Sequence, residues 1–466
     1  MPDTQHVEVL VIGSGEAGKF LAWTVAKAGR KAVLVERGVL GGACPNVACL
    51  PSKNFIYSAR VASLANRGAE FGLEFQTLRI DMTQVQRRKR LMVEDQHQLH
   101  LDRTAASGAE LVMGAARFIA PRTAEIALNS GGTRRIEGER VFLAVGTRAS
   151  MPEIAGLADA APMTHVEALE LDRLPAHLLV IGGGYVGLEL AQAMRRFGAR
   201  VTVIEHEPQL AAHEDPDVGA ALLELFRDEG IDVLLGTQVE RVEGRSGNKV
   251  VVHTKDGRGE RVVEATDLLV ATGRHANTDG LGLEQTGVEL DPRGYIRVDQ
   301  RLRTTAPNIW AMGDCAGSPL FTHVSYDDFR VVHAQLTGGD RTTTNRLIPS
   351  CMFTDPELAR VGLNETEARH AGIGYRLAKL PMSGVLRTWT VSEKRGFMKM
   401  LIAKDSDQIL GFTGFGFEAS ELMVAAQTAM IAKLPYTALR DAILAHPTMA
   451  EGLVGLLGQV EPSPPG

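Results

Sequence analysis

The sequence predicts an α/β fold made of two similar strand-turn-helix-strand units and a C-terminal α+β domain, and three observations support it. A strand, a glycine-rich turn, a helix and a second strand follow one another near the N-terminus, and the same order recurs near residue 180. After residue 346 the pattern changes to apolar strands mixed with a helical stretch. With 466 residues, the chain is long enough for three or four domains, each with its own core.

The first unit has the pattern of a Rossmann-like dinucleotide-binding domain. A strand over 7–12 leads into a glycine-rich turn, a helix and a strand over 32–35, and an acid follows 23 residues after the first glycine. In such a unit the glycines allow a tight turn, close approach of the backbone to a pyrophosphate, and packing of the helix on the strand. The helix N-terminus stabilises phosphate, and the acid accepts hydrogen bonds from a ribose. The residues predicted to bind the dinucleotide are Gly13, Gly15, Gly18 and Glu36.

The second unit repeats this pattern between residues 177 and 205. Strands over 177–181 and 201–204 flank the turn and helix, and the acid again lies 23 residues after the first glycine. One glycine motif is a weak signal, and the alternative is a pair of ordinary turns followed by exposed acids. Because strand, helix and acid are in place twice, we expect two nucleotide sites. The second set of predicted binding residues is Gly182, Gly184, Gly187 and Glu205.

Two further glycine turns indicate where the nucleotide units end. Apolar strands run into Gly146 and into Gly273, and a third strand, at 309–312, runs into Gly313 and Asp314. These positions predict four domains, with the boundaries 1–150, 151–275, 276–345 and 346–466.

Composition and charge argue against several classes of protein. The chain is 44% hydrophobic and 23% charged, with a net charge of -6, so we expect a globular enzyme and no nucleic-acid partner. The basic run from Arg87 to Arg90 is expected to be a solvated helix face. No stretch has the ~20 apolar residues of a membrane span, and residues 1–8 do not resemble a signal peptide. These features predict a cytoplasmic protein with no membrane partner.

Four cysteines occur, and two of them, Cys44 and Cys49, lie close together just after the first nucleotide unit. No second Cys or His pair lies nearby to complete a zinc site, so we expect no metal. Two structural cysteines or a redox pair remain, and the neighbouring dinucleotide site favours the redox pair. Five positions of an ideal helix turn by about 500°, so a bond between them needs a distorted first turn, for which Pro45 is suited.

The segment 41–53 resembles the active-site signature of the class I pyridine nucleotide-disulfide oxidoreductases, a family that includes dihydrolipoamide dehydrogenase, glutathione reductase and mercuric reductase. The resemblance covers essentially the whole chain. It implies the domain order FAD, NAD(P), central and interface, with one FAD per subunit and NAD(P)H as the electron donor. It also adds residues to both sites: Gly42, Lys53, Gly146 and Asp314 for FAD, and Tyr185 and Gly273 for the nicotinamide nucleotide.

The resemblance also implies roles for individual side chains. Cys44 and Cys49 would form a redox-active disulfide, in which Cys49 faces the flavin and Cys44 exchanges with the substrate. Lys53 would lie near the flavin and pair with Glu189, and Asp314 would hold the ribityl chain. For Tyr185, an aromatic gate over the flavin and a helix-packing residue are both open.

Near the C-terminus, the run from His446 to Glu451 resembles the His-Pro-Thr motif of the same family. There the histidine is the base for the interchange thiol and the glutamate orients it. In the family this histidine reaches the disulfide of the other subunit, which implies a homodimer with shared active sites. Cys315 and Cys351 match positions that are usually apolar, and we expect both to be structural.

The sequence leaves the substrate open. Glu205 favours NADH, because an acid there repels the 2'-phosphate of NADPH, although His206 keeps NADPH open. A small-molecule disulfide or oxidant is expected, with dihydrolipoamide dehydrogenase as the closest analogy. The segments 321–326 and 448–453 resemble mercuric reductase-like and oxidant-response branches instead, while the terminal segment 459–466 lacks the cysteine pair of a standard mercuric reductase. A flavoprotein subunit of a 2-oxoacid dehydrogenase complex and a non-catalytic FAD-binding protein are further alternatives.

Overall fold

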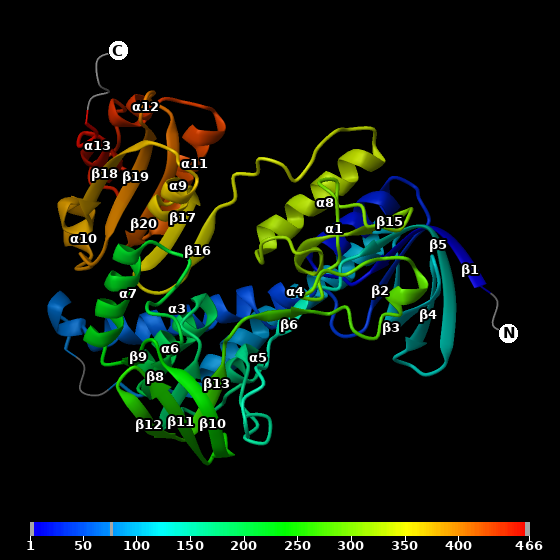
Figure 1. The fold of residues 1–466 in the computed structure, drawn as a ribbon, viewed down its shortest axis with the longest axis horizontal. Helices are drawn as coiled ribbons and strands as arrows, with labels where there is room; N and C mark the ends of the chain where they lie inside the picture. Colours follow the sequence, from blue (N-terminus) through cyan, green and yellow to red (C-terminus); the bar gives the residue numbers. More distant parts are fainter. Residues whose placement is uncertain (1–3, 75–77, 462–466) are drawn as a thin grey trace. The chain divides into compact units, whose positions relative to one another are not determined.

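The computed structural model describes residues 4–74 and 78–461, which form two compact units (Figure 1). Unit 1 consists of Met1–Asn54, Gln84–Ser150 and Gly273–Arg346, and unit 2 of Phe55–Thr83, Met151–Thr272 and Leu347–Gly466. Residues 1–3 and 462–466, the ends of the first and last predicted domains, lie outside the described residues. The α/β fold predicted from the sequence is confirmed, whereas the division into four domains stays a prediction.

A six-stranded sheet is the centre of unit 1. Its first strand, β1, is parallel to β2 and to β5, and β3 is parallel to β2. The residues of β1 from Val9 to Ile12 and of β2 from Ala32 to Val35 are all apolar and buried, as expected for parallel strands covered on both faces. The strands are β1 (Thr4–Ile12), β2 (Ala32–Glu36), β3 (Glu110–Ala120), β4 (Thr123–Leu128), β5 (Thr133–Leu143) and β15 (Ile309–Ala311).

The helices of unit 1 place the cysteine pair beside this sheet. Helix α1 (Glu16–Lys27) follows β1, and α8 (Thr322–Leu336) packs against it. Cys44 and Cys49 lie on α2 (Ala43–Asn46) and α3 (Cys49–Asn66). The short strands β6 (Thr147–Ala149) and β14 (Arg274–Ala276) pair with each other, and the 3-10 turns η2 (Leu283–Gln285) and η3 (Gly313–Ala316) complete the unit, while α3 and α4 (Met82–Ser107) continue into unit 2.

The basic run on α4 differs from its expected form. Arg87, Arg88 and Arg90 are exposed, but Lys89 is buried, with 1% of its surface exposed. The expectation of a wholly solvated face is therefore wrong for Lys89. A run of four like charges covers more than one face of a helix, because successive side chains differ by about 100° in direction.

Unit 2 contains the second predicted nucleotide unit. A parallel sheet with the strand order β13-β7-β8-β9 carries helix α6 after β7 and helix α7 after β8. An antiparallel sheet of β10, β11 and β12 follows. The bounds are α5 (His165–Leu169), β7 (His177–Ile181), α6 (Tyr185–Phe197), β8 (Arg200–Ile204), α7 (Pro216–Asp228), β9 (Asp232–Leu234), β10 (Gln238–Arg245), β11 (Lys249–Asp256), β12 (Gly259–Ala265) and β13 (Asp267–Val270); η1 (Gly68–Phe71) follows α3.

The C-terminal part of unit 2 has the predicted α+β character. Five antiparallel strands in the order β16-β17-β20-β19-β18 pack with α11 and α13 around a core that includes Met398, Phe412 and Leu453. The elements are β16 (Ser350–Met352), β17 (Glu357–Gly362), α9 (Glu365–His370), β18 (Tyr375–Pro381), η4 (Met382–Gly384), α10 (Leu386–Thr390), β19 (Phe397–Ala403), β20 (Ile409–Gly416), α11 (Ala419–Ile431), α12 (Tyr436–Arg440) and α13 (Gly452–Leu457).

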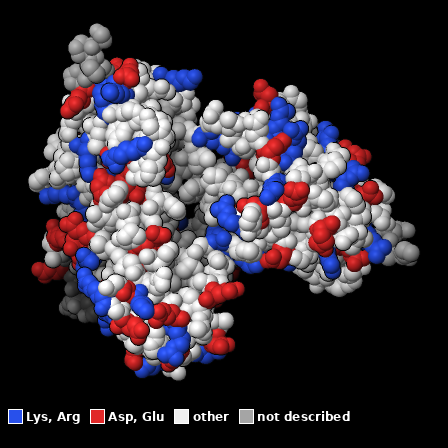
Figure 2. Space-filling view, in the orientation of Figure 1, with Lys and Arg blue, Asp and Glu red and all other residues white. Residues whose placement is uncertain are grey.

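Within the described chain, no helix has both the length and the apolar character needed to cross a membrane. On the face drawn in Figure 2, basic and acidic side chains are interspersed rather than gathered by sign.

Candidate active site

Both predicted glycine turns have the close helix-strand packing that the third glycine was expected to allow. A Cβ atom on Gly18 would lie 2.1 Å from the carbonyl oxygen of Gly13. In the second unit, a Cβ atom on Gly187 would lie 2.2 Å from the carbonyl oxygen of Gly182. Any side chain at either position would therefore push the helix away from its strand.

The helices that follow these turns begin in a way that suits a bound phosphate. Gly15 is the N-cap of α1 and Gly184 the N-cap of α6, and neither helix has a side-chain cap. The first backbone N–H groups of a helix lack partners within it and carry a partial positive charge. An anion such as a pyrophosphate fits both termini.

Glu36 closes the first turn. Its carboxylate accepts hydrogen bonds from the backbone N–H of Ser14 at 3.0 Å, the Ser14 hydroxyl at 2.6 Å and the backbone N–H of Gly38 at 2.7 Å. The Ser14 hydroxyl also accepts a bond from the backbone N–H of Gly41 at 2.9 Å. Ser14 therefore links the turn to the cysteine segment, a role that the sequence pattern did not reveal because this turn position tolerates many residues.

Gly42 brings the cysteine segment directly against the first turn. Its φ is +75°, and a Cβ atom on it would lie 2.5 Å from the Cα atom of Gly15. A side chain would separate the two segments, so glycine is required here. Lys19, on α1, supports the same approach, because its ammonium donates to the carbonyl of Gly41 at 3.4 Å.

The two cysteines lie on two separate helices, α2 and α3, rather than on one distorted helix. Cys44 belongs to α2, which ends at Asn46 and is followed by its C-cap Val47 with φ -138°, and Cys49 is the first residue of α3. Both cysteines are thiols in this structure and both are half-buried. The break after α2 supplies the distortion that the sequence led us to expect within the first turn of a single helix.

The two thiols are electrostatically different. A hydrogen bond from Cys44, the hydroxyl of Thr322 and the positive charge of Lys53 together lower the pKa of Cys49 to about 6, against the opposing effect of burial. The same hydrogen bond to Cys49 and burial raise the pKa of Cys44. At neutral pH the pair therefore shares one proton, with a Cys49 thiolate and a Cys44 thiol.

Thr322 is a site residue that the sequence analysis did not single out. It is the first residue of α8, and its hydroxyl lies 3.2 Å from the sulfur of Cys49, 273 positions away in the sequence. A hydroxyl that donates to a thiolate stabilises the charged form.

Replacing Thr322 with valine is expected to raise the pKa of Cys49 by about one pH unit, since a hydrogen bond to a charged group contributes on the order of 1.5 kcal/mol. The rate at which the reduced protein is alkylated at Cys49, followed by mass spectrometry between pH 4.5 and 9, measures this pKa. A lowered pKa means that the thiolate is present above about pH 6 and is lost below it, so the variant's profile moves to higher pH. Ser52→Ala is the matched control, because the Ser52 hydroxyl donates to the Cys49 carbonyl and not to its sulfur. An unshifted profile in Thr322→Val would contradict this role.

Gly146, Asp314 and Gly273 come together in unit 1. The hydroxyl of Thr147 donates to Asp314 at 2.7 Å, and Arg274 donates to the Thr147 hydroxyl at 2.7 Å. The neighbouring backbones are also joined, because Ser150 N–H donates to the carbonyl of Gly273 at 2.9 Å. A carboxylate held in this way, next to the strands that carry the first glycine turn, suits the hydroxyl-bearing chain of a flavin cofactor.

The second turn, in unit 2, is closed by Glu205. Its carboxylate accepts hydrogen bonds from the backbone N–H of Gly183 at 2.5 Å and of Glu207 at 2.9 Å. His206 lies 2.8 Å from the same carboxylate. Tyr185, the first residue of α6, donates its hydroxyl proton to Glu214 at 2.7 Å. The adenosine end of a dinucleotide bound at this turn would therefore lie next to the carboxylate of Glu205, which directly follows β8.

Four further residues from the sequence predictions, two charged residues and two cysteines, are located as follows. Lys53 lies on α3 in unit 1, and Glu189 is buried on α6 in unit 2, where its carboxylate accepts from the backbone N–H of Phe353 at 2.8 Å. Their ion pair stays a prediction. Cys315 is fully buried in the core of unit 1, whereas Cys351 is half-buried on β16.

His446 and Glu451 do form a pair. Nδ1 of His446 lies 2.9 Å from one carboxylate oxygen of Glu451 and 3.0 Å from the other. A carboxylate at Nδ1 orients the ring and leaves Nε2 as the nitrogen that can act as a general base. Both side chains are substantially exposed in the single chain, at 59% and 36%.

Comparison with known proteins connects these features. The family model described as pyridine nucleotide-disulphide oxidoreductase matches residues 7–328, and the dimerisation domain of the same family matches residues 348–456. The second match supports a homodimer. Residues 7–328 contain both glycine turns, the cysteine pair and Asp314, and residues 348–456 contain His446 and Glu451.

Individual relatives are similar in sequence to this protein along nearly the whole chain. The probable pyridine nucleotide-disulfide oxidoreductase RclA of Escherichia coli is 33% identical over 97% of this chain and 99% of its own length. A mercuric reductase of Streptomyces lividans is 36% identical over 96% of this chain and 94% of its own. A solved Cu(II) complex of RclA, described as an HOCl-induced flavoprotein disulfide reductase, superposes with a TM-score of 0.90 at 32% identity, covering 98% of this chain and 100% of RclA.

The protein is thus an enzyme whose family implies FAD and a pyridine nucleotide, and the glycine turns and acids described above fit both groups. Its fold, its cysteine segment and its C-terminal domain all match one family over nearly its full length. The chain belongs to the pyridine nucleotide-disulphide oxidoreductases.

Proposed function

We propose that this protein is a NADH-dependent flavoenzyme that reduces the Cys44–Cys49 disulfide and passes the electrons on to a small disulfide substrate, in the manner of dihydrolipoamide dehydrogenase. The observation that carries the proposal is the unequal pair of thiols. The pKa of Cys49 is lowered to about 6, while that of Cys44 is raised. One sulfur is suited to remain a thiolate, and the other to carry a proton that a base must remove before it attacks.

The cofactor sites would be formed by the residues around the two glycine turns. When bound, FAD would accept a hydride from the reduced nicotinamide and supply two electrons to the neighbouring disulfide. Lys53 and Glu189 would provide charge near the flavin. FAD would be held by Gly13, Gly15, Gly18, Glu36, Gly42, Gly146 and Asp314, and the nicotinamide nucleotide by Gly182, Gly184, Tyr185, Gly187, Glu205 and Gly273.

The two thiols would then reduce the substrate by thiol-disulfide exchange. With two electrons and two protons, the disulfide becomes a dithiol. The Cys44 thiolate attacks the substrate disulfide and releases one thiol; Cys49 then attacks the mixed disulfide, which restores the Cys44–Cys49 bond and releases the second thiol. His446 takes the Cys44 proton and returns it to the departing thiolate, with Glu451 holding the ring. In a homodimer, His446 would serve the disulfide of the other subunit.

The preference for NADH rests on the acidic end of β8. The carboxylates of Glu205 and Glu207 both lie beside His206. A 2'-phosphate would meet these two negative charges, whereas a ribose hydroxyl can donate to them. The cytoplasmic location stays a prediction from the sequence.

A second candidate is a metal-ion or oxidant reductase that uses the same dithiol. Its support is the similarity to an HOCl-induced reductase solved as a Cu(II) complex and to mercuric reductases. A thiolate beside a thiol is a suitable ligand pair for a soft metal ion.

A substrate panel separates the candidates. Purified protein is assayed for oxidation of NADH and of NADPH with lipoamide, glutathione disulfide, hypochlorite, Cu²⁺ and Hg²⁺. Preference for a disulfide with NADH supports the first candidate, and turnover with metal ions or hypochlorite but little with lipoamide supports the second. Co-purification with a lipoyl-bearing core would instead indicate a subunit of a 2-oxoacid dehydrogenase complex. Equal use of NADPH would contradict the role given to Glu205.

A further inference from the structure

The hydroxyl of Tyr185 has a specific partner at the mouth of the second glycine turn. Tyr185 directly follows Gly184, and its hydroxyl donates to Glu214 at 2.7 Å. Glu214 is 5% exposed and lies 29 positions later, just before α7. A tyrosine that only packed against its helix would not need a buried carboxylate as its partner, because burying a carboxylate is costly.

Glu214 is poorly satisfied apart from this bond. Its second oxygen is buried and accepts no hydrogen bond within the described chain, and the nearest cation, Arg360 on β17, lies 3.5 Å away. Burial raises the pKa of Glu214, and burial together with this carboxylate raises that of Tyr185. The hydroxyl of Tyr185 therefore provides Glu214 with its one short side-chain bond among the described contacts.

The segment that carries Glu214 is fixed to the glycine turn itself. The backbone N–H of Ala211 donates to the carbonyl of Gly183 at 2.9 Å, while the N–H of Gly183 donates to Glu205 at 2.5 Å. The chain between Glu205 and Glu214 thus wraps around the turn. The backbone N–H of Glu214 in turn donates to the carbonyl of Ala211 at 2.8 Å, so Glu214 is connected to the turn through Ala211.

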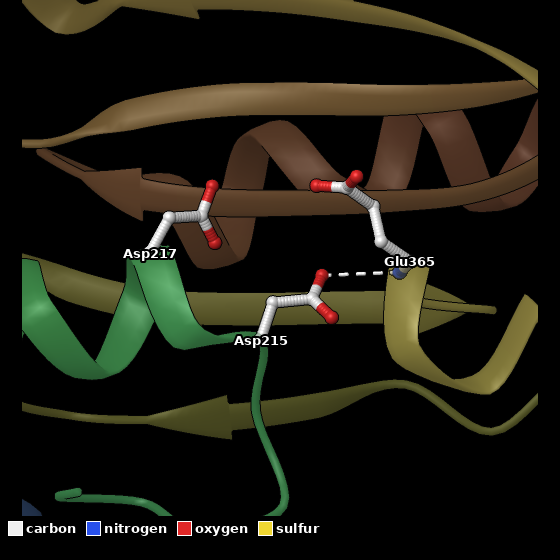
Figure 3. Close-up of side chains that lie close together, drawn as sticks. All are labelled: Asp215, Asp217 and Glu365. Atoms are coloured by element: carbon white, nitrogen blue, oxygen red, sulfur yellow. Dashed lines mark hydrogen bonds between the residues drawn. The ribbon is translucent and has the colours of Figure 1, made fainter. Parts of the chain in front are cut away.

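The C-terminal domain anchors the next residue, Asp215. Its carboxylate accepts from the backbone N–H groups of Glu365 at 3.0 Å and Thr366 at 2.9 Å. Figure 3 shows the carboxylates of Asp215, Asp217 and Glu365 gathered at the beginnings of α7 and α9. The ammonium of Lys399, which is fully buried, donates to all three at 2.7 to 2.9 Å. This internal cation takes the place that a metal ion would need, so the cluster is a rigid anchor for Glu214.

We propose that Glu214 is a positioning residue for nicotinamide nucleotide binding: through its hydrogen bond it holds the Tyr185 ring in one orientation at the entrance to the second glycine turn. The inference rests on the proposed binding of the nucleotide at that turn. A ring held in place leaves the site ready for the nucleotide, whereas a released ring samples orientations that obstruct it. Affinity then falls in proportion to the fraction of protein in the competent form.

Tyr185→Phe and Glu214→Ala are each expected to raise the NADH concentration for half-maximal reduction of the bound flavin about tenfold, with a nearly unchanged limiting rate. The double variant should show the same change as Tyr185→Phe alone, because that substitution already removes the bond to Glu214, together with the bond of the Tyr185 hydroxyl to Ser350. Glu214→Gln keeps an acceptor of the same shape and should stay within about threefold of the wild type. Tyr436→Phe is the matched control, since it removes the hydroxyl of another buried tyrosine, on α12, which belongs neither to the contacts of Glu214 nor to its anchor.

Anaerobic stopped-flow measurement of flavin reduction by NADH tests the proposal without any disulfide or metal substrate. An unchanged half-saturating concentration in Tyr185→Phe, or a double variant whose effect is the product of the two single effects, would overturn it. If Glu214→Ala does not fold, Tyr185→Phe and Glu214→Gln carry the test. If NADH fails to reduce the flavin of the wild type, the proposed function is wrong; if it does, and the variants match the wild type, the positioning role alone is wrong.

Discussion

The Cys44→Ser variant is expected to have an activity with a disulfide substrate at least about 1000-fold lower than that of the wild type, while it keeps its bound flavin. A serine hydroxyl is a far weaker nucleophile than a thiolate and cannot form a mixed disulfide. Cys49→Ser should be equally inactive, because the second thiol is needed to release the mixed disulfide. Steady-state turnover with NADH and the best substrate of the panel measures the loss, and the visible flavin spectrum reports the bound cofactor.

Cys351→Ser is the matched control for these variants. Cys351 is also half-buried, but it lies on β16, outside the segment that carries the pair. Its substitution should leave turnover within about twofold of the wild type, in the range of a conservative change that does not touch the site. Full activity of Cys44→Ser with a disulfide substrate would show that the dithiol is not on the electron path.

His446→Ala is expected to lower kcat by 100-fold to 10,000-fold, the usual range for removing a general acid-base group. The structure gives the reason, because the pKa of Cys44 is raised and its proton must be removed before attack. A raised pKa means that Cys44 stays protonated at neutral pH, so the variant should recover part of its rate as the pH increases. Glu451→Gln keeps a hydrogen-bond acceptor for Nδ1 and should lose only about tenfold.

His370→Ala is a suitable control, because His370 is an exposed histidine of the same C-terminal domain, at the end of α9. Its kcat should match that of the wild type. The pH-rate profile with a disulfide substrate is the measurement. A His446→Ala profile that coincides with the wild-type profile would remove His446 from the mechanism.

Features that depend on local spacing were predicted well from the sequence. Strands β7 and β8 lie within one residue of their predicted bounds, and helix α6 ends at Phe197, one residue before Gly198. The pairing of His446 with Glu451 was also expected, because the two residues are five positions apart in one recognisable motif. Such features are decided by short segments, in which glycine spacing and apolar periodicity carry the information.

Features that depend on tertiary contacts were not predicted. The bond between Thr322 and Cys49 joins residues 273 positions apart, and nothing in the segment around Thr322 indicates its partner. The burial of Lys89 and of Lys399 runs against the usual exposure of lysine. Lys399 is explained by its three carboxylates, which come from segments up to 184 positions away.

The central claim is that electrons from the nicotinamide nucleotide reach Cys44 and Cys49. Differential alkylation tests it most directly: air-oxidised protein is treated anaerobically with or without NADH, alkylated and digested, and the label on each cysteine is measured by mass spectrometry. We expect NADH to make Cys44 and Cys49 reactive, while the labelling of Cys315 and Cys351 stays the same. Labelling of Cys44 and Cys49 that does not change with NADH would contradict the account.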